Sequence, residues 1–90
     1  MVTVFGLGFV GLTTALGFSH LGYKVYGVDV DAERKKILRA GNLPFLEPHM
    51  DKVLREHLDK NFFVTDDIKA AVADSEIIYY CVGTPYGADG

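Results

Sequence analysis

Short apolar runs alternate along the chain with segments whose apolar positions repeat with a helical period. The apolar runs are compact and rich in β-branched and aromatic residues, and they predict four strands at residues 2–5, 24–29, 62–65 and 76–82. The segments between them predict four helices at residues 10–21, 32–40, 49–58 and 66–73. This alternation is typical of an α/β fold in which a parallel sheet carries helices on both faces.

Right-handed crossovers arrange these four strands in the spatial order 3-2-1-4. Asp31 and Thr65 are of the residue types that cap helices, and we expect them to begin the second and fourth helices. Two prolines between residues 42 and 48 predict an irregular loop with apolar side chains that need cover.

The first predicted strand runs directly into the pattern Gly-x-Gly-x-x-Gly, and a helix follows. We expect Gly6 to turn the chain off the strand, Gly8 to let a pyrophosphate approach the backbone, and Gly11 to let the helix pack closely on the sheet. The helix then offers unpaired N–H groups and the positive end of its dipole to the phosphates. The pattern therefore predicts a Rossmann-type dinucleotide site, although a tight turn without a ligand has the same glycines.

The second predicted strand ends in Asp29, 18 positions after Gly11. This spacing is close to that of the carboxylate that binds the adenosine ribose in such folds, and a carboxylate there favours NAD over NADP because it repels a 2′-phosphate. Arg34 lies five positions further on, in the first turn of the next helix, where it could reach the ribose or the adenine.

Composition excludes several classes of function. The 90 residues are enough for one small domain, and the net charge of −3 offers no basic surface for nucleic acid. No apolar run is long enough to predict a membrane span. The single cysteine, Cys81, allows no intrachain disulfide and favours a cytoplasmic setting. It ends the last predicted strand, which we expect to be buried, and we expect Cys81 itself in the core. The three histidines are scattered without metal-ligand spacing, and we expect surface or packing roles for them.

Four motifs together resemble one family. Residues 6–12 (GLGFVGL), 27–31 (GVDVD), 44–48 (PFLEP) and 81–85 (CVGTP) occur in this order. The chain is similar to the N-terminal NAD-binding domain of the UDP-glucose/GDP-mannose dehydrogenase family. Members oxidise the primary alcohol of a nucleotide-linked sugar to a carboxylate in two NAD-dependent hydride transfers, for example in polysaccharide biosynthesis.

The resemblance also implies roles for single residues. It assigns backbone N–H donors to Phe9 and Val10, ribose contacts to Asp29 and Arg34, and a place near the nicotinamide to Thr84. The family's catalytic cysteine and its nucleotide-sugar domain lie beyond residue 90, so we expect residues 1–90 to be a partial NAD-binding domain, inactive alone. We expect a homo-oligomer for the full-length protein. Alternatives are a nucleotide-sensing regulatory domain without catalysis and another NAD-dependent dehydrogenase of hydroxyacid type.

Overall fold

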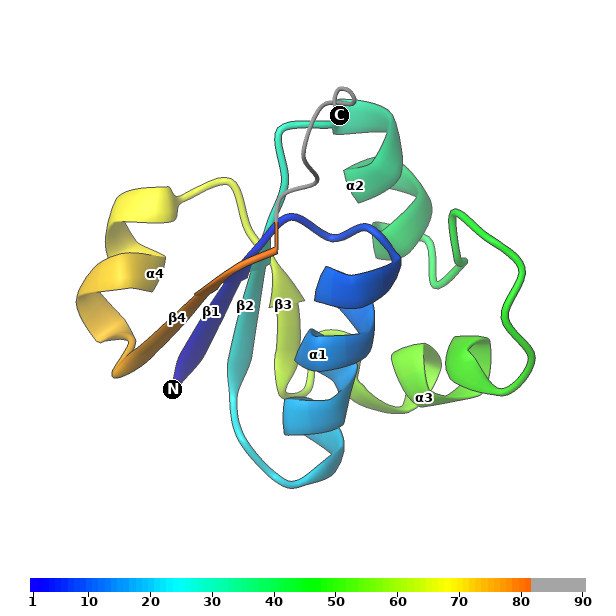
Figure 1. Cartoon of the computed structure of the whole chain (residues 1–90), viewed down its shortest axis with the longest axis horizontal. Coiled ribbons are helices and arrows are strands. Elements are labelled where there is room, and N and C mark those ends of the chain that lie inside the picture. The colour runs from blue at the N-terminus through cyan, green and yellow to red at the C-terminus, as the bar shows by residue number, and fades with distance from the viewer. Residues whose placement is uncertain (82–90) are drawn as a thin grey trace.

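The computed structural model describes residues 1–81, and Figure 1 shows their arrangement. The strands in this part of the chain are β1 (Val2–Phe5), β2 (Val25–Val28), β3 (Phe62–Val64) and β4 (Ile77–Tyr80). The helices are α1 (Phe9–His20), α2 (Ala32–Arg39), α3 (Met50–His57) and α4 (Ile68–Asp74). The eight elements are those predicted from the sequence, with ends that differ by one or two residues.

The strands form one parallel sheet in the order β3-β2-β1-β4, as predicted. Val4 of β1 lies opposite Gly27 of β2 on one side and opposite Tyr79 of β4 on the other. Figure 1 shows α4 on one face of the sheet and α1 and α3 on the opposite face. Because all strands run the same way, their carboxyl ends meet at one edge, which is the edge where β1 passes into α1.

The core lies between the sheet and the two helices, α1 and α3, that cover one of its faces. Ten buried apolar residues form it, and they come from the part of the chain between β1 and β3: Val2, Val4, Leu7, Leu12, Ala15, Leu16, Val25, Leu38, Leu54 and Phe62. A Cβ on Gly27 would lie 2.9 Å from Leu7 and 3.0 Å from Phe62, so only glycine lets these two side chains meet over β2. The face under α4 is more polar, because the buried Thr3 hydroxyl donates to the carbonyl of Ala71.

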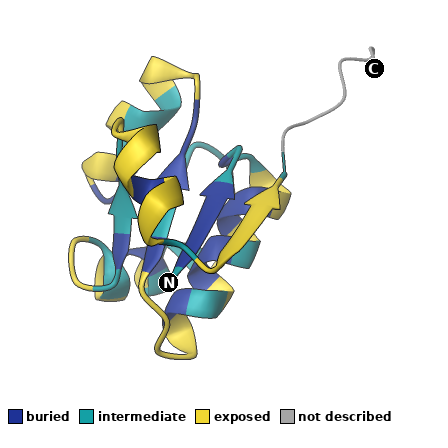
Figure 2. Cartoon of the chain, turned by 90° about the vertical axis from the view of Figure 1, so that its left-hand side faces the viewer, coloured by how far each residue is buried: buried dark blue, intermediate teal, exposed yellow. Residues whose placement is uncertain are grey.

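Two local predictions differ from the structure. Thr65 does not cap the fourth helix: its hydroxyl accepts from the Asp67 N–H at 3.0 Å, and Asp67 is the N-cap, accepting from Ala70 N–H. Thr65 therefore forms a turn that leads into the N-cap residue of the helix, Asp67. The last strand is also not buried, because all four residues of β4 are exposed at the edge of the sheet described by residues 1–81 (Figure 2).

None of the helices in residues 1–81 has both the length and the apolar character that a membrane crossing requires.

Candidate functional site

The glycine turn closes tightly between β1 and α1. Gly6 has a φ of 91°, in the left-handed region that favours glycine, and its N–H donates to the Val28 carbonyl at 2.8 Å. A Cβ on Gly11 would lie only 1.6 Å from the Gly6 carbonyl oxygen and 3.1 Å from the Cβ of Cys81. The structural roles predicted for Gly6 and Gly11 are therefore confirmed: the first turns the chain, and the second brings α1 against the sheet.

Gly8 leaves open space at the start of α1. It is the N-cap residue with extended backbone, and a Cβ there would meet no atom of the described residues within 4 Å. No side chain caps this helix, and its first turn holds no acidic residue. The first-turn N–H groups, including those of Phe9 and Val10, therefore face an open cradle with the positive end of the helix dipole behind it.

Asp29 lies directly after β2 and is 8% exposed. One carboxylate oxygen, Oδ2, accepts from the Leu7 N–H at 2.6 Å, and the other, Oδ1, accepts from the Asp31 N–H at 2.8 Å. Burial alone raises the pKa of Asp29, but these two backbone hydrogen bonds and the Arg34 guanidinium outweigh it and hold the pKa below its ordinary value. The carboxylate is therefore ionised at neutral pH.

Arg34 completes this arrangement from α2. The Asp31 side chain caps that helix by accepting from Glu33 N–H and Arg34 N–H, as predicted, and this places Arg34 in the first turn. Its Nη1 donates to Asp29 Oδ2 at 3.1 Å. Because a carboxylate offers about four acceptor positions, one position on Oδ1 stays free, beside the remaining N–H groups of the guanidinium.

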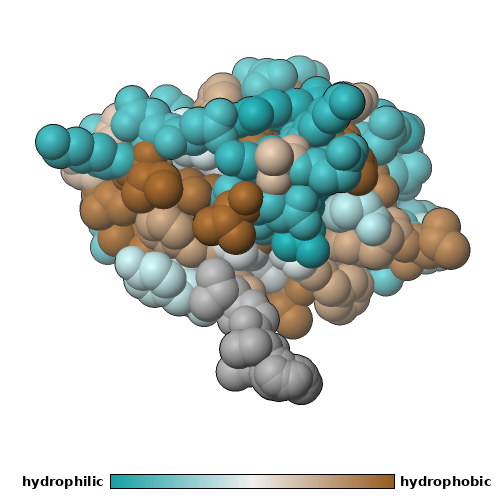
Figure 3. All heavy atoms as spheres, turned by 90° about the horizontal axis from the view of Figure 1, so that it is seen from above, coloured by the Kyte–Doolittle hydropathy of each residue, from teal (hydrophilic) through white to brown (hydrophobic). Residues whose placement is uncertain are grey.

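These groups line one cavity of about 490 Å³ at the carboxyl edge of the sheet. Its lining consists of Gly6, Gly8, Phe9, Val10, Asp29, Val30, Arg34 and Cys81. Figure 3, which looks onto this end of the molecule, shows apolar patches beside polar ones. A ligand with charged and apolar parts fits such a surface, because Asp29 and Arg34 offer hydrogen bonds while the fully exposed Val30 offers apolar contact.

The structure brings together most of the residues predicted from the sequence. Six of them line the cavity, and Gly11 lies behind the turn; Thr84 lies outside the described residues. Two lining residues were missed, Val30 and Cys81. Cys81 packs against the core as expected, but it is only partly buried and also faces the cavity. The predicted strand order could have indicated these two residues, because Val30 follows β2 and Cys81 follows β4, the two strands that flank β1.

The prediction of scattered histidines is wrong for two of the three. The rings of His20 and His57 are 5.7 Å apart, since the carboxyl ends of α1 and α3 lie side by side. Spacing along the sequence identifies only residues that are neighbours on one helix, and these two residues come from different helices. This pair lies at the opposite end of α1 from the cavity.

Comparison with known proteins gives consistent matches over the whole chain. A family model described as "UDP-glucose/GDP-mannose dehydrogenase family, NAD binding domain" matches residues 1–90. The UDP-glucose 6-dehydrogenase of Pseudomonas aeruginosa is 41% identical over 88 residues, which are 97% of this chain and 19% of that protein. The GDP-mannose 6-dehydrogenase of the same organism is 36% identical over 90 residues, covering 99% and 21%.

Solved structures agree with the sequence matches. A ternary complex of the Pseudomonas aeruginosa GDP-mannose dehydrogenase has a TM-score of 0.86 at 36% identity, covering 93% of this chain and 20% of that one. A UDP-glucose dehydrogenase from Pyrobaculum islandicum has a TM-score of 0.85 at 34% identity, covering 92% and 19%. The chain thus spans about a fifth of the length of these dehydrogenases.

Proposed function

The chain belongs to the UDP-glucose/GDP-mannose dehydrogenase family, as its NAD-binding domain, and we propose that the cavity around Gly8, Asp29 and Arg34 holds the NAD. The observation that carries this proposal is the ionised, buried Asp29 carboxylate beside an open, uncapped helix N-terminus. A dinucleotide needs both groups, one for its ribose hydroxyls and one for its phosphates.

The residues present fit the adenosine ribose. One ribose hydroxyl donates to the free acceptor position of Asp29 Oδ1, and a guanidinium N–H of Arg34 donates to a ribose oxygen. Both groups are already oriented, because Asp29 accepts from Leu7 N–H and Asp31 N–H and also holds Arg34. Little side-chain freedom is then lost on binding.

The same pair explains a preference for NAD over NADP. A 2′-phosphate would have to approach the ionised Asp29, and the positive charge of Arg34 is already compensated by that carboxylate at 3.1 Å. The phosphate would therefore meet repulsion without a free counter-charge.

The pyrophosphate fits the start of α1. The Phe9 and Val10 N–H groups donate to its oxygens, Gly8 keeps the approach open, and Gly6 and Gly11 hold the turn in place. We place Thr84 near the nicotinamide half on the basis of the family motif alone. When bound, NAD accepts the hydride that leaves the substrate carbon.

The activity belongs to a longer protein, because the chain spans about a fifth of its relatives. We propose that this protein oxidises the primary alcohol of a UDP- or GDP-sugar to a carboxylate with two NAD, and that residues beyond 90 bind the sugar nucleotide. We further propose that it works in the cytoplasm as a homo-oligomer and supplies sugar acids for polysaccharide synthesis.

Calorimetric titration of the chain with NAD and with NADP tests the cofactor site. Asp29→Asn removes the ionised carboxylate, and Asp31→Asn is the matched control, because it removes the same charge two residues away while asparagine still caps α2. We expect tighter binding of NAD than of NADP, and a loss of this preference of about tenfold or more in Asp29→Asn only. The proposal fails if the folded chain binds neither cofactor, or if both variants change the preference equally.

A further inference from the structure

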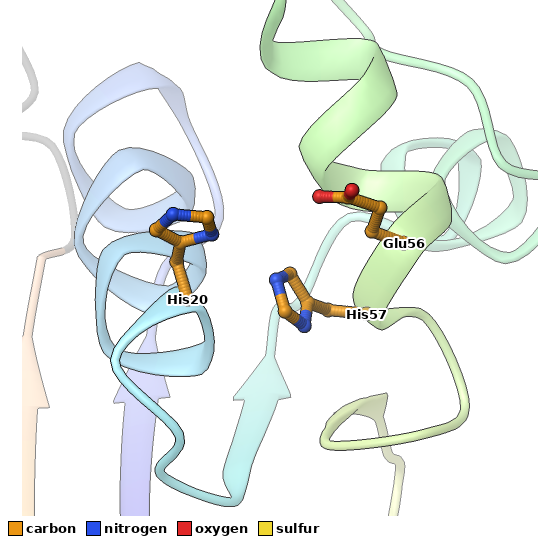
Figure 4. Close-up of side chains that lie close together, drawn as sticks. All are labelled: His20, Glu56 and His57. Atoms are coloured by element: carbon orange, nitrogen blue, oxygen red, sulfur yellow. The ribbon is translucent and has the colours of Figure 1, made fainter.

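A group of metal-ligating side chains lies where the carboxyl ends of α1 and α3 meet. His20 is the last residue of α1, His57 is the last residue of α3, and Glu56 precedes it. One ligand atom from each of the three lies within 4.8 Å of the others. Figure 4 shows the Glu56 carboxylate and both rings directed toward the space between the two helices.

Asn61 determines which nitrogen of His57 carries the proton. The amide nitrogen of Asn61 donates to the backbone carbonyls of Ser19 and Tyr23, at 2.6 and 3.3 Å. Its Oδ1 is therefore an acceptor, and it lies 2.8 Å from His57 Nδ1. Nδ1 must carry the hydrogen of this bond, so in the neutral ring the lone pair is on Nε2.

This Nε2 atom is buried and has no hydrogen-bond partner among the described residues. An unpaired buried acceptor loses its hydration without compensation, which is uncommon in folded proteins. In Figure 4 the free nitrogen of His57 is on the side of His20 and Glu56. A histidine that donates from one nitrogen to a carbonyl oxygen and presents the other to a cluster of ligands has the arrangement of a metal-bound histidine.

The backbone favours a positive charge at the same place. Two helices, α1 and α3, end here, and each carboxyl end carries a partial negative charge of about half a unit. Apart from the two imidazoles, the nearest last-turn basic residue is Arg55, which pairs with Asp51 at 3.6 Å. Among the described residues, the last turns of α1 and α3 therefore carry no basic side chain other than Arg55 and the two histidines.

We propose that His20, Glu56 and His57 bind a zinc ion that links the ends of α1 and α3. Two imidazole nitrogens and one carboxylate oxygen suit Zn²⁺, with water or another group in the fourth position. Ligand atoms around zinc are about 3.3 Å apart when each bond is near 2.0–2.1 Å. In the structure the ligand atoms lie within 4.8 Å of one another, so they must move closer to bind the ion. His20 and Glu56 are exposed and can rotate to do so, while His57 is held in place by Asn61.

Zinc titration of the full chain, without a histidine tag, tests this proposal. His20→Gln and Glu56→Gln change only exposed side chains, so both variants should fold like the parent. His49→Asn is the control: His49 is the third histidine and lies outside the group, and asparagine accepts its φ of 79°. We expect one zinc ion per parent chain, affinity lowered about tenfold or more in the first two variants, and parental affinity in the control.

Cobalt replaces zinc as a spectroscopic probe in the same variants. Cobalt bound by nitrogen and oxygen gives visible bands without the strong near-ultraviolet thiolate band. We expect these bands to need about tenfold or more cobalt in His20→Gln to reach the parental intensity. A parent chain that binds no zinc would overturn the proposal, as would parental affinity in either His20→Gln or Glu56→Gln or an equal loss in His49→Asn. A thiolate band would also overturn it, because the ion would then be bound by Cys81.

Discussion

Replacing Gly8 by alanine separates cofactor binding from folding. Gly8 has φ −72° and ψ −166°, a conformation that any residue adopts, and a new Cβ meets no atom within 4 Å. Alanine loses less backbone entropy on folding, which stabilises by about 0.4–1 kcal/mol, but it is a weaker N-cap than glycine by a similar amount. The two effects nearly cancel, so we expect the free energy of unfolding to stay within about 0.5 kcal/mol of the parent.

The effect on NAD follows from where the methyl group lies. It stands in the open cradle before the first-turn N–H groups of Phe9 and Val10, where the pyrophosphate approaches. A hydrogen bond from a backbone N–H to a charged oxygen contributes about 1.5–3 kcal/mol. The loss of one such bond lowers NAD affinity by about ten- to a hundredfold.

Calorimetric titration with NAD and thermal unfolding together measure both quantities. The matched control is Gly17→Ala, which is the same change on the same helix, where a Cβ also meets no atom within 4 Å. Gly17 lies within α1, away from the cavity, so we expect a gain of about 0.5–1 kcal/mol in stability and unchanged NAD affinity. Parental NAD affinity in Gly8→Ala, or an equal loss in the control, would refute the placement of the pyrophosphate.

Three further predictions concern stability. Gly11→Ala should destabilise by about 3 kcal/mol, measured by urea unfolding, because the methyl would lie 1.6 Å from the Gly6 carbonyl oxygen and backbone atoms cannot rotate away. Asp31→Ala removes the acceptor for two N–H groups of α2, and the loss of about 1 kcal/mol should lower the melting temperature by roughly 4–8 °C; an unchanged midpoint contradicts this. The pKa of Asp29 in the folded chain is held below its ordinary value of 3.8. The ionised carboxylate therefore stabilises the folded state above that pH, and this contribution is lost as the pH falls below it. Urea unfolding at neutral pH and near pH 3 should show this acid loss in the parent and a smaller loss in Asp29→Asn.

The sheet could be predicted because its determinants are local. Each strand is a short apolar run, and the right-handedness of crossovers, together with the glycine pattern after the first strand, indicates the order 3-2-1-4. The start of α4 could not be predicted in the same way, because Thr65 and Asp67 are both capping residues two positions apart. Only the structure decides between them: the Thr65 hydroxyl accepts from Asp67 N–H, and the Asp67 carboxylate caps α4 by accepting from Ala70 N–H.

The two candidate sites differ in how far the sequence reveals them. The cofactor cavity is built mainly where β1 and β2 end, so the spacing from Gly6 to Asp29 predicts most of its lining but not Val30 or Cys81. The histidine pair depends on α3 packing beside α1, which no pattern along the chain specifies. His20 and His57 become neighbours only through the tertiary structure, and Asn61 then determines which nitrogen of the neutral His57 ring carries the hydrogen.

Asp29 connects the fold with the cofactor site. Its carboxylate accepts from Leu7 N–H after β1 and from Asp31 N–H before α2, and it also holds Arg34. A substitution there must therefore lower both stability and NAD affinity, because Leu7 and Asp31 lose a buried acceptor while the ribose loses its own. Gly8 has no such double role, since no atom of residues 1–81 lies within 4 Å of where its Cβ would be. A loss of NAD binding at Gly8 without a loss of stability is thus the clearer evidence for the site. A coupled loss at Asp29 is what its three hydrogen bonds within the chain, together with its proposed bond to the ribose, require.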